Sequence, residues 1–547
     1  MQIIIPMAGT GKRFQDAGYT APKPLIEVDG KTIIEHVVNL FPGESNFSFI
    51  CSSEHLRQPN IREILETIAP GCNIYEIPPH KKGPVYTVSF VFNYLDDNDE
   101  VIVNYCDFSK YWDYRDFLSH TRSRNADGAI SAYKGFHPHM LGSTNYAFIR
   151  EDNQWMLEIK EKEPFTDNRM QEYASDGTYY FRKGDFVKKY FKQLMEQDIN
   201  VNGEYYISMV YNLMKRDNLD ISIYEIQHML QWGTPRDMEE YQRWSDYFRQ
   251  IIKPRQNIAP QKGSINLIPL AGAGSRFVKK GYKNPKPLIE INKKPMVIQA
   301  ANCLPKAEQY VFVCLAEHLD KYSLSQEIQK VYPNAKIVRI YNITEGQACT
   351  CEIGLKDEDM ESPLLIGACD NGMLWDEVKY VDCLNDKDID AIVWSFRHYP
   401  QTERNPQMYG WIRVDEDDNV LGVSVKKQIS DNPYNDHAVV GTFYFKKAEY
   451  FIESLKRLQE KNIRVNNEFY VDSCVNELIE TGLKVKVFEV EHYIGWGTPN
   501  ELKTYEYWQS FFHKCNWHPY RIEKDVSINR DKMVDNKVDS TSRIKVF

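Results

Sequence analysis

A glycine-rich stretch that occurs twice decides the fold of this chain. Residues 9–14 read Gly-Thr-Gly-Lys-Arg-Phe, and residues 272–277 read Gly-Ala-Gly-Ser-Arg-Phe. Each is followed by Pro-Lys-Pro-Leu-Ile-Glu, at residues 22–27 and again at residues 285–290. Both motifs recur after 263 residues. A constant separation between two motifs indicates that one long segment of the chain is repeated.

Further matches extend the repeat almost to the C-terminus. They are Glu-His-Leu at 54–56 and 317–319, Cys-Asp at 106–107 and 369–370, and Trp-Gly-Thr-Pro at 232–235 and 496–499. So long a period predicts two whole domains rather than a solenoid of short repeats. We expect domains at residues 1–250 and 264–515, a linker near 253–263 and a polar C-terminal tail at 516–547. Cutting the chain near residue 258 is then expected to give two separately soluble domains.

Apolar patterning predicts the fold class. Short apolar runs at residues 3–5 and 265–268 precede the two glycine stretches, as in buried strands. After the first Pro-Lys-Pro segment, Ile33, Val37 and Phe41 recur at helical spacing. Further strands are expected at residues 47–51, 101–104, 310–315 and 364–368. Strands that alternate with helices predict an α/β fold around a mostly parallel sheet.

Composition excludes several classes of protein. The 547 residues carry 67 Lys plus Arg against 77 Asp plus Glu, a net charge of −10, which argues against a nucleic-acid partner. No apolar run approaches the ~18 residues of a membrane span, so no membrane partner is expected. The N-terminus lacks the basic region of a signal peptide, and the 11 cysteines are an odd number. These features predict a cytoplasmic protein with reduced thiols.

The glycine stretch is suited to binding phosphate. Gly9 and Gly11 allow the backbone to approach a ligand, and exposed N–H groups there can contact phosphate oxygens. Arg13 adds a planar, permanently charged fork. Lys23 lies between two prolines that fix the backbone, which directs its ammonium group toward the loop. A plain turn without a ligand is the alternative. The counterparts in the second copy are Gly272, Gly274, Arg276 and Lys286.

These motifs resemble those of the sugar-phosphate nucleotidyltransferases, also called sugar-nucleotide pyrophosphorylases, over roughly residues 1–248 and 265–510. The resemblance implies two tandem Rossmann-like nucleotidyltransferase domains, each with a mostly parallel mixed sheet flanked by helices. It implies that loop and arginine hold the triphosphate and that the lysine contacts the reacting phosphate. It also implies that Asp107 and Asp370, which follow apolar strands, bind Mg²⁺; helix N-capping is the alternative for both.

The same resemblance assigns the remaining site residues. Glu161 and Lys162 are expected to contact the sugar phosphate, whereas the second copy has valine before its lysine, Lys426. Gly83 and Gly346 lie in the blocks that contact the nucleotide in the family.

The second metal-binding aspartate of many family members is missing here. Gln231 and Gly495 stand at that position, and neither is a good Mg²⁺ ligand. Glu204 and Glu468, each in an Asn-x-Glu-aromatic-Tyr motif, are candidate replacements or substrate contacts. A capped helix start is the alternative for both motifs.

The predicted activity is transfer of a nucleotidyl group from an NTP to a sugar or polyol phosphate. It would release pyrophosphate and make an activated precursor for a surface polysaccharide. The acceptor phosphate is already a nucleophile, so cationic groups and Mg²⁺ need only neutralise charge and align the reactants.

Two alternatives stay open. One is a glycosyltransferase, although neither Asp107 nor Asp370 lies in an Asp-x-Asp motif. The other is a partly degenerate protein in which one copy regulates or scaffolds. The first copy is favoured for catalysis because it alone keeps the Glu-Lys pair.

Overall fold

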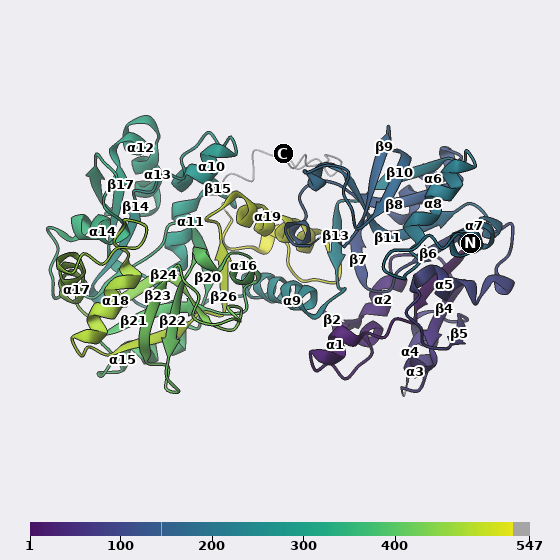
Figure 1. Cartoon of the computed structure of the whole chain (residues 1–547). Helices are drawn as coiled ribbons and strands as arrows, with labels where there is room; N and C mark the ends of the chain where they lie inside the picture. The colour runs from purple at the N-terminus through teal and green to yellow at the C-terminus, as the bar shows by residue number, and fades with distance from the viewer. Residues whose placement is uncertain (59, 144, 529–547) are drawn as a thin grey trace. The chain divides into compact units, whose positions relative to one another are not determined.

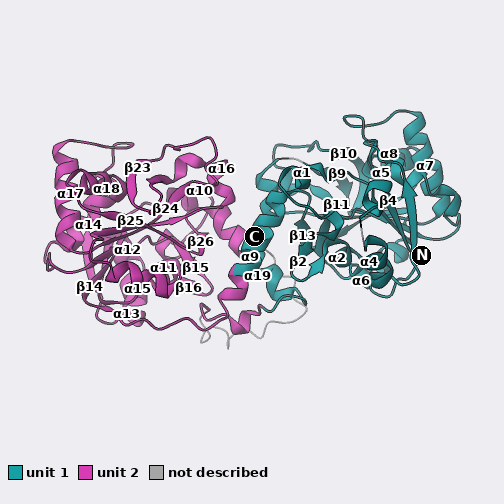
Figure 2. Ribbon diagram, turned by 90° about the horizontal axis from the view of Figure 1, so that it is seen from below, with its two compact units in different colours: residues 1–246, 507–519 teal, residues 247–506, 520–547 magenta. Residues whose placement is uncertain are grey.

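The structure is a computed structural model that describes residues 1–58, 60–143 and 145–528. It divides into two compact units, drawn in different colours in Figure 2. Among the described residues, unit 1 consists of residues 1–246 and 507–519, and unit 2 consists of residues 247–506 and 520–528. Among the described residues, no helix combines the length and the apolar character that crossing a bilayer requires.

Unit 1 is built on a nine-stranded mixed sheet (Figure 1). Its strands lie in the order β5-β4-β1-β6-β11-β8-β12-β10-β9, and the first four run parallel to one another. Two short ribbons, β2–β3 and β7–β13, lie outside the sheet. The strands are β1 Gln2–Met7, β2 Glu27–Val28, β3 Lys31–Thr32, β4 Phe47–Ser52, β5 Asn73–Ile77, β6 Val101–Asn104, β7 Phe108–Tyr111, β8 Gly128–Tyr133, β9 Ala147–Asp152, β10 Trp155–Glu161, β11 Tyr173–Phe181, β12 Ile221–Glu225 and β13 His228–Gln231.

Helices cover the sheet of unit 1. They are α1 Lys12–Asp16, α2 Ile33–Val38, α3 Ser53–Leu56, α4 Ile61–Ile68, α5 Gly83–Ser89, α6 Tyr114–Ser123, α7 Gly184–Glu196, α8 Ile207–Arg216 and α9 Pro235–Gln250. One core joins Ile4 and Val103 of the sheet to Val85 of α5, Val187 of α7 and Ile207 of α8. Because side chains alternate along a strand, the neighbours of Ile4 on β1 face the other side of the sheet.

Unit 2 has a sheet of the same design. The order is β18-β17-β14-β19-β24-β21-β25, with β22 paired to both β23 and β24. Its strands are β14 Gln261–Leu270, β15 Glu290–Ile291, β16 Lys294–Pro295, β17 Ala307–Leu315, β18 Lys336–Ile340, β19 Leu364–Ile366, β20 Asn371–Leu374, β21 Ala391–Phe396, β22 Gly410–Val414, β23 Val420–Val425, β24 His437–Phe445, β25 Val485–Glu489 and β26 His492–Gly495. Their pairings repeat those of unit 1 strand by strand, except that β10 also pairs with β12.

The helices of unit 2 form two layers around this sheet. They are α10 Ser275–Lys279, α11 Met296–Cys303, α12 Ala316–Lys321, α13 Leu324–Val331, α14 Gln347–Leu355, α15 Glu377–Asn385, α16 Pro400–Arg404, α17 Ala448–Glu460, α18 Val471–Glu480 and α19 Pro499–Lys514, of which the part from Tyr507 onward belongs to unit 1. Leu267 of β14 packs in a core with α14, α17 and α18, whereas Ile268 packs in a second core with α11 and α13. The α/β class predicted from the sequence is therefore confirmed.

The boundaries between the parts of the chain differ from those expected. The units divide after Asp246, inside α9, and β14 begins at Gln261, within the expected linker. Residues 507–519 belong to unit 1, where the Tyr507 hydroxyl accepts a hydrogen bond from the Met229 N–H (3.1 Å) and donates one to the Met229 carbonyl (2.7 Å). An aromatic-rich C-terminal segment thus completes the first unit.

The polar tail expected from residue 516 is packed as far as residue 528. Tyr520 and Asp525 of unit 2 are both fully buried, and the tyrosine hydroxyl donates a 2.7 Å hydrogen bond to the aspartate. Asn292 donates to Ser527 Oγ at 2.6 Å. A few buried side chains hold this segment although its composition is polar overall. The rest of the expected tail, residues 529–547, lies outside the described residues.

Candidate active site

The glycine loop joins β1 to α1 and packs against the lysine of the Pro-Lys-Pro segment. Gly11 has a φ of 60°, in the left-handed region that favours glycine, and a Cβ there would lie 3.5 Å from Lys23 Cβ. Gly274 has the same φ, and its Cβ would lie 2.9 Å from Lys286 Cβ. The two glycine loops therefore share one backbone conformation and one neighbour.

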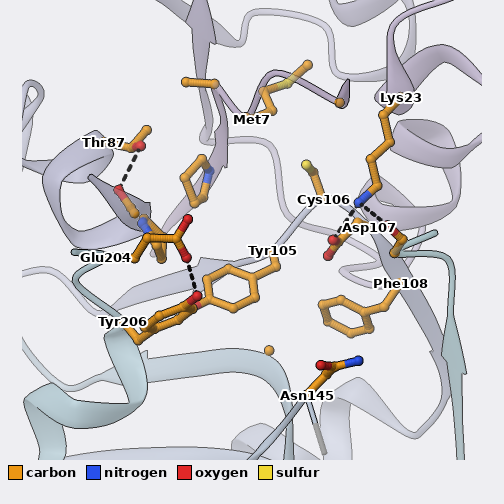
Figure 3. Close-up of a pocket in the computed structure, with 18 of the residues that line it drawn as sticks. Met7, Lys23, Thr87, Tyr105, Cys106, Asp107, Phe108, Asn145, Glu204 and Tyr206 are labelled. Carbon is orange, nitrogen blue, oxygen red and sulfur yellow. Dashed lines mark hydrogen bonds and ion pairs between the residues drawn. The ribbon is translucent and has the colours of Figure 1, made fainter. Parts of the chain in front are cut away.

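The lysine and the strand-end aspartate meet in both units. Lys23 Nζ donates to Asp107 Oδ2 at 2.7 Å and to the Gly233 carbonyl at 3.3 Å (Figure 3). Lys286 forms the same ion pair with Asp370. Burial works to lower the pKa of Lys286, but the Asp370 carboxylate and Cys369 outweigh it, so this pKa is raised. Each pair sets a fixed positive charge beside a carboxylate that stays partly exposed, 37% in Asp107 and 30% in Asp370.

The arginines of the two loops are open to a ligand. Arg13 on α1 and Arg276 on α10 are exposed, and the described part of the chain supplies neither with a hydrogen-bond or ion-pair partner. A guanidinium free of protein partners is able to bind phosphate oxygens with both of its edges.

A cavity of about 540 Å³ lies beside the loop of unit 1. This volume is typical of a small-molecule site. All the residues that the sequence assigned to the first copy line it: Gly9, Gly11, Arg13, Lys23, Gly83, Asp107, Glu161, Lys162 and Glu204. Figure 3 shows Lys23 and Asp107 on one side of this cavity and Glu204 and Tyr206 on the other. Cationic phosphate-binding groups and a second polar cluster thus share one space.

The second cluster is a chain of hydrogen bonds. Lys162 Nζ donates to the Tyr206 hydroxyl at 2.6 Å, and that hydroxyl donates to Glu204. Glu161 accepts a 2.6 Å hydrogen bond from Ser208 Oγ, and burial raises the pKa of Glu161 to about 7. A lysine, a phenol and two carboxyl groups can bind a phosphate together with sugar or polyol hydroxyls.

Gly83 and Gly346 have a clear packing role. A Cβ on Gly83 would lie 2.7 Å from Tyr205 N, and one on Gly346 would lie 2.5 Å from Phe469 N. Both residues have positive φ, 84° and 132°. Because of this close approach, the start of α5 packs against the Asn-x-Glu-aromatic-Tyr motif of unit 1, and the start of α14 packs against that of unit 2. Whether either glycine also contacts a nucleotide stays a prediction.

A second carboxylate does lie near Asp107, but it comes from α9 rather than from position 231. Gln231 Nε2 donates to Asp237 Oδ1 at 2.6 Å, and the Thr234 N–H donates to Asp237 Oδ2 at 2.7 Å. A Cβ on Gly233 would lie 3.7 Å from Asp237 Oδ2 and 3.8 Å from Asp107 Oδ2. Asp237 and Thr234 form a capping box at the start of the helix, a spacing that is visible in the sequence.

Unit 2 places Glu501 of α19 in the same position with a free oxygen. The space left by Gly495 is filled by Glu501, whose Oε1 would lie 2.6 Å from a Cβ there. A Cβ on Gly497 would lie 2.9 Å from Asp370 Oδ2 and 3.6 Å from Glu501 Oε2. Glu501 is 6% exposed, and its Oε2 has no hydrogen-bond partner among the described residues. Asp370 and Glu501 together therefore suit a divalent cation better than either alone.

The cation would need further ligands, since no cluster of three or more His, Cys, Asp or Glu able to hold a metal occurs in the described residues. Mg²⁺ commonly takes one or two carboxylates and completes its shell with water and substrate phosphates. Glu204 and Glu468, the candidates from the sequence, each accept a hydrogen bond from the tyrosine two residues on, in the second polar cluster or its counterpart in unit 2.

Sequence reasoning missed a buried ion pair at the cavity wall of unit 1. Lys110 Nζ lies 2.9 Å from Asp176 Oδ2 and donates to Thr178 Oγ1 at 2.6 Å, and both charged side chains are 0% exposed. Burial lowers the pKa of Lys110 to about 8. Asp176 lines the cavity. No motif could have revealed the pair, because the corresponding residues of the second copy, Met373 and Val440, are apolar.

Comparison with known protein families finds one match in the first part of the chain: residues 3–163 match the MobA-like NTP transferase domain. No curated protein matches the chain.

Several solved structures are similar to part of the chain. A nucleoside-diphosphate-sugar pyrophosphorylase from Vibrio cholerae is 23% identical, with 44% of this chain and 99% of that chain covered and a TM-score of 0.38. A putative glucose-1-phosphate thymidylyltransferase from Bacillus anthracis is 17% identical over 44% and 93%, with a TM-score of 0.36. The inositol-1-phosphate CTP transferase from T. maritima is 15% identical over 45% and 94%, with a TM-score of 0.36.

Proposed function

We propose that this chain transfers the nucleotidyl group of an NTP to a sugar or polyol phosphate and releases pyrophosphate. One observation carries the proposal. The glycine loop, the Lys23–Asp107 pair and the polar cluster around Glu161 and Lys162 line a single cavity. Such a space takes a triphosphate at one end and a hydroxylated phosphate at the other. The product would be an activated precursor for a surface polysaccharide.

Different residues of unit 1 bind the triphosphate and the acceptor. Loop N–H groups and Arg13 bind the triphosphate and the departing pyrophosphate, and Lys23 neutralises charge at the α-phosphate. Lys162 binds the acceptor phosphate, while Glu161 and Glu204 accept hydrogen bonds from its hydroxyls. No general base is needed, because the acceptor phosphate attacks as an anion. Alignment and charge neutralisation are therefore the main contributions of the protein.

Asp107 and Asp370 would hold Mg²⁺, with Glu501 as a further carboxylate in unit 2. The fit rests on the partly exposed aspartates and on the free Oε2 of Glu501. When bound, the ion would neutralise phosphate oxygens and help to align the triphosphate. Lys23 and Lys286, which pair with these aspartates, would keep them oriented.

The proposal is tested by a pyrophosphate-release screen of the four common NTPs against sugar and polyol phosphates, with and without Mg²⁺. We expect release with at least one NTP and acceptor pair, and only when Mg²⁺ is present. Lys23→Met with Lys286→Met is the control that should abolish it. Hydrolysis or transfer of sugar from a nucleotide sugar, without pyrophosphate, would favour the glycosyltransferase instead.

A further inference from the structure

Unit 2 has valine at the position of Glu161, but it has a carboxylate on the neighbouring helix. Glu161, the last residue of β10, contacts Ser208 of α8 in unit 1. The corresponding residues of unit 2 are Val425, the last residue of β23, and Asp472 of α18. In unit 1 the strand carries the carboxyl group and the helix carries a small residue. In unit 2 the strand carries an apolar residue and the helix carries the carboxyl group.

Hydrogen bonds fix this correspondence. Asn212 of α8 bonds the backbone of Ile159, with N–H to Oδ1 at 3.1 Å and Nδ2 to O at 2.8 Å. Asn476 of α18 bonds Val423 in the same way, at 2.8 and 2.9 Å. Glu161 pairs with Ala147 across β9–β10, and Val425 pairs with Gly410 across β22–β23. Helix and strand therefore have the same register in both units.

The structure gives Asp472 a place of its own. It is 9% exposed, and a Cβ on Gly410 would lie 3.3 Å from Asp472 Cγ and closer still to Oδ2. Since alanine stands at the equivalent position of unit 1, glycine at 410 makes the room that this carboxylate occupies. No other described residue forms a hydrogen bond or an ion pair with the Asp472 carboxylate. A buried carboxylate so poorly satisfied within the protein is available to an external donor.

The rest of the polar cluster is retained around Asp472. Lys426 has a φ of 58°, against 60° in Lys162, and its Nζ lies 5.3 Å from the ring centre of Tyr470. The Tyr470 hydroxyl donates to Glu468 at 2.5 Å. In unit 1 the corresponding lysine lies 4.6 Å from the Tyr206 ring. Unit 2 therefore presents a lysine, a phenol and two carboxylates, as unit 1 does.

We infer that Asp472 is the acceptor-binding carboxylate of unit 2, and that the two units select different hydroxylated phosphates. The inference rests on the proposed function. Aspartate is one methylene shorter than glutamate, and Asp472 approaches from a helix whereas Glu161 approaches from a strand. A hydroxyl bound by Asp472 must therefore occupy another position on the acceptor than one bound by Glu161. From the sequence, only the first copy was expected to keep an acceptor carboxylate. Under this inference each unit has one, and the two sites differ in specificity.

The test uses the full chain with Asp107→Asn, which leaves only unit 2 able to turn over. Adding Asp472→Asn should raise the acceptor KM about tenfold or more and leave the KM for the NTP unchanged. Glu480→Gln, an exposed change at the other end of α18, is the matched control and should move neither. Calorimetric titration of the acceptor without NTP should show the same loss of affinity, independent of turnover.

A transplant separates specificity from simple damage. Val425→Glu with Asp472→Ser gives unit 2 the arrangement of unit 1, so its acceptor preference should shift toward that of the Asp370→Asn chain, in which only unit 1 works. The inference would be overturned if Asp472→Asn left the acceptor KM unchanged. It would also be overturned if the Asp107→Asn chain showed no turnover while the wild type is active. Neither result would overturn the proposed function. No pyrophosphate release by the wild type with any pair would instead overturn the proposed function.

Discussion

At the scale of single residues, the decisive feature is a lysine held between two prolines and paired with an aspartate at the end of a strand. Lys23 and Lys286 have limited freedom, because proline fixes the backbone on both sides. Their ammonium groups lie beside Asp107 and Asp370. Such preorganisation lets a charge act on a phosphate without further reorientation.

Arg13→Ala should weaken NTP binding about tenfold to a hundredfold, the range for losing a hydrogen bond to a charged group. The arginine is exposed and has no hydrogen-bond or ion-pair partner within the described chain, so the melting temperature should stay unchanged. Calorimetry and thermal melting measure the two effects. Asp16→Ala, an exposed change on the same helix at a residue that does not line the cavity, is the control and should leave affinity nearly as it is. A lowered melting temperature with unchanged affinity would make Arg13 a structural residue.

Glu161 should make unit 1 less stable as the pH rises. Burial raises its pKa from 4.5 to about 7, so the folded state binds the proton more tightly than the unfolded state does. The stabilisation is complete below about pH 4.5 and is lost as the pH rises through about 7. Glu161→Gln cannot ionise, so relative to the wild type it should gain stability between about pH 5 and pH 8, by no more than about 3 kcal/mol.

Urea unfolding at several pH values checks this. Glu163→Gln, whose exposed carboxylate pairs with Lys160, provides the baseline. A constant difference in stability between wild type and Glu161→Gln across this pH range would show that Glu161 is not held in a desolvating site.

At the scale of elements, the start of α5 depends on glycine. Gly83→Ala would place a Cβ 2.7 Å from Tyr205 N on a backbone of positive φ. Overpacking and an unfavourable φ together should cost at least about 2 kcal/mol and displace the segment that carries Glu204. Gly18→Ala, at a φ of 87° with open space around it, should cost about 1 kcal/mol from the φ alone. Equal losses in urea unfolding would contradict the close approach.

The sequence predicted those parts of the site that rest on local patterns. The glycine loop, the Pro-Lys-Pro lysine and the strand-end aspartate are each a short motif with a mechanical reason, and the repeat doubled the signal. Asp237, Glu501 and Asp472 were missed because their roles depend on where a helix packs. A strand position that loses its glutamate can be compensated from a neighbouring helix, and only the three-dimensional register shows this.

At the scale of the whole molecule, the two units do not follow the two repeats along the chain. Unit 1 includes residues 507–519, which begin inside α19 of the second copy and extend beyond residue 515. A fragment that ends near residue 258 lacks the Tyr507 hydroxyl that bonds both backbone groups of Met229. The fragment should therefore melt below unit 1 of the full chain; that the two halves are separately soluble stays a prediction.

Tyr507→Phe removes only the hydroxyl and keeps the rest of the segment, so it tests the contribution of the hydroxyl by itself. It leaves the Met229 N–H and carbonyl unpaired in a buried place, at a cost of about 1–3 kcal/mol to unit 1. Hydrogen exchange at the Met229 amide should become faster. Tyr111→Phe, on the strand paired with β13 and 39% exposed, is the control. Unchanged exchange at Met229 in Tyr507→Phe would mean that unit 1 does not rely on this residue.

The proposed reaction of the whole chain joins a nucleotide to a phosphorylated acceptor with loss of pyrophosphate. Phosphorus-31 NMR of the full chain with an NTP, Mg²⁺ and an active acceptor follows every phosphorus atom in one sample. We expect the NTP signals to be replaced by those of pyrophosphate and by a new pair of coupled diester resonances, in equal amounts. Adding inorganic pyrophosphatase should drive the reaction forward. Formation of a nucleoside diphosphate with inorganic phosphate, and no coupled diester pair, would contradict it.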